Sequence, residues 1–252
     1  MTQNKLQLNE SKTEIILFGK PAELKKIDNV TLEINSTTIV PSKKAKNLGI
    51  IFDEALAMAD HVINLCRNLY FEISRINLIR RYLSFEATVT LMVSLVLSKL
   101  DYGNALLSGL SLEQLHKLQK IQNHAAKIIY RKNKTDHVKP LLKSLHWLPV
   151  KERIDYKISM IVYKCLNNLA PHYLQELLQL NQCKISRQLR STSDKTLLFI
   201  PRANFKSFGD RSFQLYGPYI WNSLPREIRE SASLEIFKTA LKSYLFRSAF
   251  GL

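Results

Sequence analysis

The chain has 252 residues, 46% of them hydrophobic, with only 7 Gly and 8 Pro, a composition that excludes a disordered or fibrous protein. This length can bury a sizeable core in one large domain or two modest ones. With 37 Lys and Arg against 21 Asp and Glu, the formal net charge is +16, so nucleic acid is the expected partner, ahead of an anionic membrane. A cationic surface kept only for solubility is the alternative.

Cysteine usage and apolar segments both predict an intracellular protein, in the nucleus or the cytoplasm. Cys66, Cys165 and Cys183 are odd in number, widely separated and outside any Cys-x-x-Cys pair, which favours reduced thiols over disulfides or a metal site. The first ten residues lack an apolar signal core. The most apolar stretch, residues 87–98, is shorter than the roughly twenty residues that a bilayer span requires. We expect it to be a core helix and expect no membrane partner.

The hydrophobic periodicity changes once, near residue 54. Before that point, short segments rich in β-branched residues predict strands at 13–19, 30–34, 37–40 and 46–52. From residue 55 onward the spacing is helical and predicts one helix to about residue 81 and a second, starting at Ser84, to about residue 102. The first of these helices is expected to face the core with Ile63, Leu65, Leu69, Ile73, Ile76 and Ile79.

The next predicted helix starts after Ser111, a candidate N-cap with Gln114 in the capping-box position. Its apolar stripe is Leu115, Leu118, Ile121, Ala125, Ile128 and Ile129. Cationic residues at intervals of three or four form a positive ridge beside this stripe: Lys117, Lys120, His124, Lys127 and Arg131. Such a ridge suits a phosphate backbone, because each cation near a phosphate releases condensed counterions. A solvated helix face is the alternative interpretation.

Downstream, helices are expected at 137–148, 150–169 and 171–180, followed by a basic linker at 184–193. A strand at 196–200, an aromatic-rich stretch at 212–222 and a helix capped by Ser233 complete the chain. The fold class is therefore α+β and mostly helical. Three regions are predicted: short strands at 1–54, a helical region at 55–183 and a small α+β segment at 184–252.

Arginines and aromatic residues of the C-terminal region are further candidates for nucleic-acid contact. Arg187, Arg190, Arg202 and Arg211 lie in loop-like sequence, and the guanidinium group matches phosphate geometry well. They could instead pair with Asp194, Asp210 or Glu227. Trp147 and Trp221 could stack on bases, but packed core positions are the favoured interpretation.

Several short segments, in unbroken order over nearly the whole chain, carry a family resemblance. They are Leu8-Asn9, Lys12-Thr13 and Phe18-Gly19, then Leu48-Gly49-Ile50 with Asp53, then 145–150 (Leu-His-Trp-Leu-Pro-Val) and 221–225 (Trp-Asn-Ser-Leu-Pro). In this order they resemble the C-terminal part of a LINE-type (non-LTR) retrotransposon reverse transcriptase. The resemblance implies the last palm strands, a helical thumb and the C-terminal segment of that enzyme. It also implies that Leu48, Gly49 and Asp53 correspond to the strand and turn that grip the primer.

The catalytic centre of that family is missing from this sequence. No Tyr-x-Asp-Asp or Phe-x-Asp-Asp occurs, although nucleotidyl transfer requires carboxylates that hold two divalent cations, Mg²⁺ in the parent family. The cluster Asp53, Glu54, Asp60 and His61 is expected to open a helix and is not assigned to a metal. We expect no catalytic residue and no cofactor in this chain.

The resemblance and the charge together predict a truncated RNA-directed DNA polymerase that is inactive alone. It would bind RNA or an RNA/DNA hybrid through the thumb ridge and the arginine loops, and the missing catalytic half of the polymerase is a possible partner. The alternative is a domesticated or inert retroelement remnant that acts only as a protein-interaction module.

Overall fold

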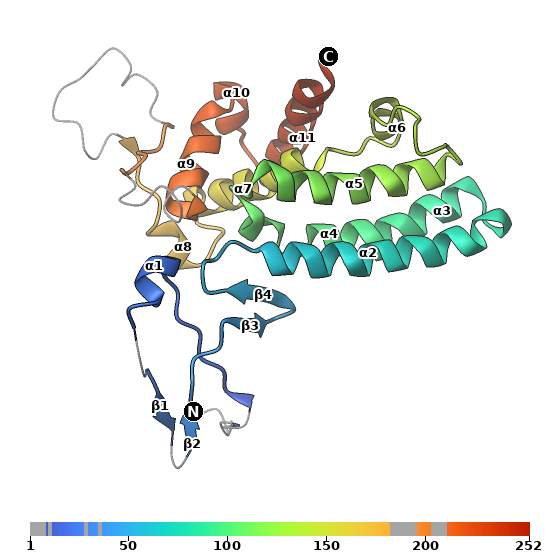
Figure 1. Ribbon diagram of the computed structural model, residues 1–252. Helices are drawn as coiled ribbons and strands as arrows, with labels where there is room; N and C mark the ends of the chain where they lie inside the picture. Colours follow the sequence, from blue (N-terminus) through green and yellow to red (C-terminus); the bar gives the residue numbers. More distant parts are fainter. Residues whose placement is uncertain (1–8, 10–11, 28–29, 35–36, 182–195, 203–210) are drawn as a thin grey trace. The chain divides into compact units, whose positions relative to one another are not determined.

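The computed structural model describes residues 9, 12–27, 30–34, 37–181, 196–202 and 211–252 (Figure 1). The chain divides into two compact units, residues 1–65 and residues 66–252. Helix α2 (Ala59–Ile79) starts in the first unit and continues into the second. The boundary predicted between residues 183 and 184 lies outside the described residues, as do Cys183 and the linker at 184–193.

The first unit contains a short helix and two antiparallel strand pairs. Helix α1 (Pro21–Leu24) precedes β1 (Leu32–Ile34), which pairs with β2 (Thr37–Ile39), while β3 (Lys44–Asn47) pairs with β4 (Ile50–Asp53). The predicted single strand at 46–52 is therefore wrong. Leu48 and Gly49 both have positive φ, 46° and 85°, which is the backbone of a two-residue hairpin turn.

The strand predicted at 13–19 is also wrong, because this segment forms no described strand. It is tied to its neighbours by single backbone bonds, from the Ser42 amide to the Ile15 carbonyl (2.8 Å) and from the Gly19 amide to the Glu54 carbonyl (3.1 Å). A segment of high β-propensity forms a strand only where a neighbouring strand pairs with it through a continuous ladder of backbone hydrogen bonds.

All the named secondary-structure elements of the second unit are helices or helical turns. After α2 come α3 (Phe85–Met92), α4 (Ser98–Asp101), α5 (Leu112–Ile129), α6 (Lys139–Ser144), α7 (Val150–Leu166), α8 (His172–Gln175), α9 (Phe213–Ser223), α10 (Arg226–Arg229) and α11 (Leu234–Phe250). A π-helical turn (Val93–Leu97) joins α3 to α4, and 3₁₀ turns lie at Arg80–Tyr82 and Asn104–Leu107. The described residues are thus mostly helical with two small strand pairs, as the α+β prediction requires. None of the described helices is both long enough and apolar enough to cross a bilayer.

The N-caps predicted at Ser111 and Ser233 are confirmed, and Ser84, predicted only as a helix start, is a third. The hydroxyl oxygens of Ser84, Ser111 and Ser233 accept hydrogen bonds from the amides three residues later, those of Ala87, Gln114 and Ile236. Each bond satisfies one of the free amides in the first turn of a helix. The starts of α3, α5 and α11 therefore follow from local sequence.

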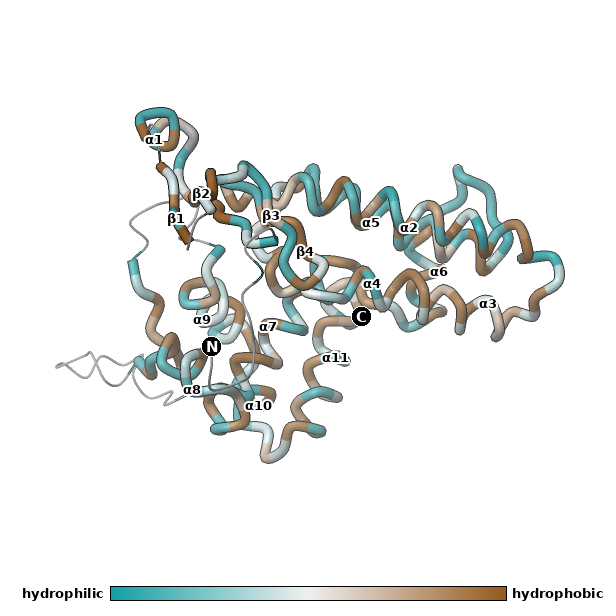
Figure 2. Tube along the Cα trace, turned by 90° about the horizontal axis from the view of Figure 1, so that it is seen from below, coloured by the Kyte–Doolittle hydropathy of each residue, from teal (hydrophilic) through white to brown (hydrophobic). Residues whose placement is uncertain are grey.

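Helix α7 is the centre of the core, since it contacts α5, α9 and α11. Hydrophobic positions recur along these helices in Figure 2. Trp221 of α9 is 1% exposed and donates from its indole nitrogen to the Thr196 carbonyl (2.9 Å). Its ring lies 5.8 Å from that of Phe237, which stacks on Tyr163 at 4.3 Å. Trp147 is 6% exposed, so the core interpretation holds for both tryptophans.

Two amide side chains, buried Gln122 and half-buried Gln119, join α5 to the corner at 145–150. The Gln122 amide nitrogen donates to the Leu148 carbonyl (2.8 Å), and the Gln119 side-chain oxygen accepts from the Val150 amide (2.8 Å). Gln122 is 0% exposed, and its hydrogen bond compensates the cost of burying a polar group. These bonds fix the end of the 139–150 region against α5.

Four further expectations are corrected. Ile63 and Ile79 of α2 are 57% and 47% exposed, because they lie off the buried face that Leu69 and Ile73 occupy. The helix predicted at 171–180 ends with α8 at Gln175. The strand predicted at 196–200 is a single bridge between Leu198 and Leu180. The part of 184–252 that the structure describes is consequently helical apart from that bridge.

Candidate nucleic-acid interface

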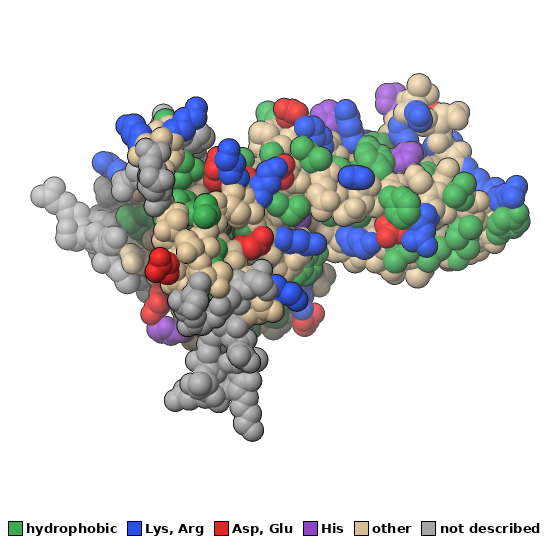
Figure 3. Space-filling model, turned by 60° about the horizontal axis from the view of Figure 1, so that its bottom comes forward, with side chains coloured by type: hydrophobic (Ala, Val, Ile, Leu, Met, Phe, Trp, Pro, Cys, Tyr) green, Lys and Arg blue, Asp and Glu red, His purple; other side chains and the backbone are tan. Residues whose placement is uncertain are grey.

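The net positive charge belongs entirely to the second unit. Residues 1–65 carry eight lysines and eight acidic residues, so the whole formal charge of +16 lies in residues 66–252. In the face shown in Figure 3, Lys and Arg side chains spread over the helical part, with few acidic side chains among them. A polyanion would thus be attracted to this unit.

The predicted ridge lies on one side of α5. Lys117 and Lys120 are exposed, Lys127 is half-buried, and Arg131 is exposed just beyond the helix. The opposite side is buried in the core by Leu118, Ile121, Ala125 and Ile129, each 0% exposed. Burial of that stripe forces the residues at the complementary positions of the helix toward solvent. We call the row Lys117, Lys120, His124, Lys127 and Arg131 the α5 ridge.

Two members of the α5 ridge have partners. The Lys117 ammonium lies 2.7 Å from the Glu113 carboxylate one turn earlier, an exposed pair of the kind that contributes little to stability. The Lys127 ammonium donates to the Lys134 carbonyl. Lys120 has no carboxylate within ion-pair distance among the described residues. The ridge therefore keeps most of its positive charge.

His124 contributes little charge at neutral pH. Its imidazole ring lies 5.8 Å from the ring of Tyr70 on α2. Burial, and then the charges of Lys134 and Lys127, lower the pKa of His124 below its ordinary value. Neutral imidazole at this position reduces like-charge repulsion along the ridge.

Arg80, which sequence reasoning missed, supports the end of α5. Its guanidinium donates to the Ile128 carbonyl (3.2 Å), the Ile129 carbonyl (2.8 Å) and the Leu83 carbonyl (2.9 Å). A cation at the carboxyl end of a helix is favoured because it meets free carbonyls and the negative end of the helix dipole. No local pattern marks this role, since 48 residues separate Arg80 from Ile128.

The predicted loop arginines have different positions. Arg187 and Arg190 lie outside the described residues, and Arg202 is exposed. Arg211 is half-buried beside the loop that precedes α5, where its carbonyl accepts a hydrogen bond from the Ser108 hydroxyl (3.1 Å). The structure thus brings Arg211 to the start of α5. It gives no such placement for the others.

The three primer-grip-like residues lie in the β3–β4 hairpin of the first unit. Leu48, 81% exposed, and Gly49 form its turn, and Asp53 ends β4. One carboxylate oxygen of Asp53 accepts from the Ala57 amide (2.8 Å), and the other is buried without a hydrogen-bond partner among the residues that the structure describes. Asp53 therefore anchors the turn that follows β4.

The acidic cluster expected to open a helix is split between two elements. Asp53 ends β4 and Glu54 lies in the turn after it, whereas Asp60 and His61 lie in α2. Asp60 pairs with Lys44 at 2.9 Å, and burial lowers the pKa of His61. In the described ranges, no three side chains of the His, Cys, Asp or Glu type gather as metal ligands would.

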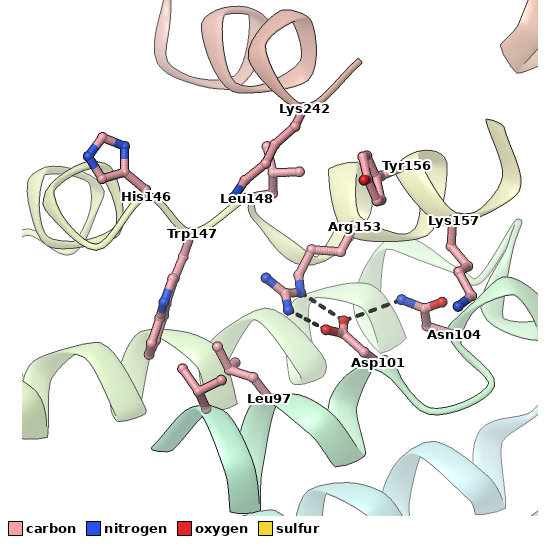
Figure 4. A pocket seen from close by; sticks show the side chains of 11 residues that line it. Leu97, Asp101, Asn104, His146, Trp147, Leu148, Arg153, Tyr156, Lys157 and Lys242 are labelled. Atoms are coloured by element: carbon pink, nitrogen blue, oxygen red, sulfur yellow. Dashed lines mark hydrogen bonds and ion pairs between the residues drawn. The ribbon is translucent and has the colours of Figure 1, made fainter. Parts of the chain in front are cut away.

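A cavity of about 400 Å³ in the second unit was not predicted (Figure 4). Arg153 of α7 forms a two-bond ion pair with Asp101 of α4, through its Nε at 2.8 Å and through Nη2, and Asn104 adds a 3.3 Å bond to the same carboxylate. Lys157 and Lys242 also line the cavity. Because Asp101 neutralises Arg153, these two lysines supply its remaining positive charge.

No protein-family model, curated protein or solved structure matches this chain.

Proposed function

We propose that residues 66–252 bind RNA or an RNA/DNA hybrid through the α5 ridge, as the thumb region of a truncated non-LTR retrotransposon reverse transcriptase. The observation that carries the proposal is the row of cations on the solvent side of α5, adjoining a fully buried apolar face. The order of the family-like motifs supports it. By the same resemblance the chain would be inactive as a polymerase unless a separate catalytic half supplied the Mg²⁺-binding carboxylates.

The dimensions of the ridge suit a phosphate backbone. Lys117 and Lys127 are ten residues apart, which is about 15 Å along a helix at roughly 1.5 Å per residue. One strand of a duplex carries a phosphate about every 3.4 Å of axis, so the part of the ridge from Lys117 to Lys127 spans about four phosphates. Lysine side chains are long and mobile enough to adapt to that spacing.

A salt series tests the proposal. The purified full chain is titrated onto a labelled RNA/DNA hybrid, together with a variant in which Lys117, Lys120, Lys127 and Arg131 are each replaced by Gln. Each phosphate contact contributes about 0.7 to 0.9 to the slope of log K against log salt, so we expect the slope to decrease by about 2 to 4. The substituted side chains are solvent-facing or half-buried, and the fold should survive.

A charge-matched control separates the ridge from net charge. Lys25, Lys26, Lys43 and Lys46 of the first unit are exposed, and their replacement by Gln removes the same formal charge. That variant should keep the wild-type slope. If the two variants lose affinity equally, binding depends on overall charge and the ridge has no special role. If a folded, monomeric wild-type sample does not bind at low salt, the alternative of a protein-interaction module is favoured.

A further inference from the structure

Helix α2 carries two neighbouring exposed aromatic side chains, one of which lies beside the α5 ridge. Tyr70 and Phe71 of α2 are 42% and 63% exposed, and Tyr70 contacts His124 of the ridge at a ring distance of 5.8 Å. Successive residues of a helix point about 100° apart, so the two rings face different directions. One ring borders the ridge, and the other lies on the outer side of α2.

Cations surround these rings, and the nearby acids are paired. The Arg75 guanidinium lies 5.8 Å from the centre of the Phe71 ring, and exposed Arg67 is one turn before Phe71 on the same face. Glu72 binds Lys99 at 2.8 Å and Arg75 at 3.5 Å. The local field is therefore positive, which attracts a polyanion such as nucleic acid.

We propose that α2 and α5 bind a single strand of nucleic acid, with its phosphates along the α5 ridge and unpaired bases stacked on Tyr70 and Phe71. The inference rests on the function proposed above and specifies that the bound nucleic acid includes unpaired bases. Bases inside a duplex are covered by their neighbours, whereas unpaired bases offer a free face to an aromatic side chain. A ridge without aromatic rings would bind duplex and single strand through phosphates alone.

The test compares two ligands and two variants of the full chain. A labelled 20-nucleotide oligodeoxyadenylate offers unpaired purines, and an RNA/DNA hybrid of equal length offers none. Replacing Tyr70 and Phe71 by Leu keeps apolar, helix-favouring side chains at exposed positions. Loss of base stacking on both rings should weaken single-strand binding about 30-fold or more and leave hybrid binding within about twofold.

A control variant replaces two other exposed aromatics, Tyr173 and Tyr219, by Leu; they are 66% and 62% exposed. It should bind both ligands as the wild type does. Phe71→Trp supplies a spectroscopic readout, because Trp147 and Trp221 are buried and contribute a constant background. The fluorescence of the added indole should be quenched by the single strand and not by the hybrid.

The outcomes separate this inference from the proposed function. Single-strand affinity that is unchanged by the Tyr70 and Phe71 substitutions, in a protein whose hybrid binding depends on the α5 ridge, would overturn the stacking inference alone. A wild-type chain that binds neither ligand would overturn both.

Discussion

Removing the guanidinium of Arg80 should destabilise the second unit and its α5 ridge. Arg80 is 8% exposed and donates three hydrogen bonds to backbone carbonyls, two of them in the last turn of α5. Arg80→Met keeps the apolar stem of the side chain and removes only the charged head. The variant therefore isolates the effect of the hydrogen bonds.

The expected decrease in the free energy of unfolding depends on whether each of the three carbonyls keeps another hydrogen-bond donor. A hydrogen bond to a charged group contributes about 1.5 to 3 kcal/mol, and a buried group left unpaired costs about 1 to 3 kcal/mol. The Ile128 carbonyl keeps a bond from the Arg131 amide at 3.2 Å, so it is not left unpaired. The Ile129 and Leu83 carbonyls lose the guanidinium. We expect a decrease of about 2 to 4 kcal/mol in the free energy of unfolding.

Urea denaturation followed by tryptophan fluorescence measures this difference, because Trp147 and Trp221 are buried in the same unit. The shift in midpoint multiplied by the denaturant slope gives the change in free energy. Arg81→Met is the matched control, since Arg81 is the exposed neighbour whose guanidinium lies 4.6 Å from the Tyr82 ring. The control should lose less than about 1 kcal/mol. Equal stability of the Arg80 and Arg81 variants would refute the capping role of Arg80.

Three further outcomes are expected. Gly109→Ala should cost about 1 to 3 kcal/mol in thermal or urea unfolding, because Gly109 has φ +66° and an added Cβ would lie 2.5 Å from Arg211 Cγ. Tyr216→Phe removes a 2.8 Å bond to buried Asp155 and should cost about 1 to 3 kcal/mol. Burial first, and then the Asp155 carboxylate, raise the pKa of Tyr216 in the folded state. The free energy of unfolding should therefore fall as pH rises above the ordinary phenol pKa of about 10. This fall should be steeper in the wild type than in Tyr216→Phe. Burial first, and then lysine charges, lower the pKa of His124, so hybrid binding should tighten as pH falls below about 6.5, and His124→Gln should reduce that gain.

Each of these three predictions has an outcome that would contradict it. A Gly109→Ala protein as stable as the wild type would mean that the loop before α5 adapts without strain. Parallel stability curves for the wild type and Tyr216→Phe above pH 10 would show that the phenol titrates normally in the folded state. If His124→Gln leaves the pH dependence of binding unchanged, other histidines account for it.

Sequence alone predicted the features that depend on a few neighbouring residues. Ser111 and Ser233 were recognised as N-caps because the capping bond joins residues only three apart. The buried stripe and the cationic ridge of α5 follow from a helical period of 3.6 residues. The pairing of Lys117 with Glu113 obeys the same local geometry, and the spacing of four residues was a signal that could have predicted it.

Only the tertiary structure decided what depends on partners distant in the chain. Segments 13–19 and 46–52 have similar β-propensity, yet one lacks a ladder and the other folds into a hairpin at Leu48 and Gly49. Ile63 fits an apolar helical period and is exposed, because the neighbours of α2 cover another face. The placement of Tyr70 beside His124, and of Arg80 beneath the end of α5, likewise joins residues about fifty positions apart. Local rules act over a few residues, whereas packing selects among the faces and pairings that those rules leave equivalent.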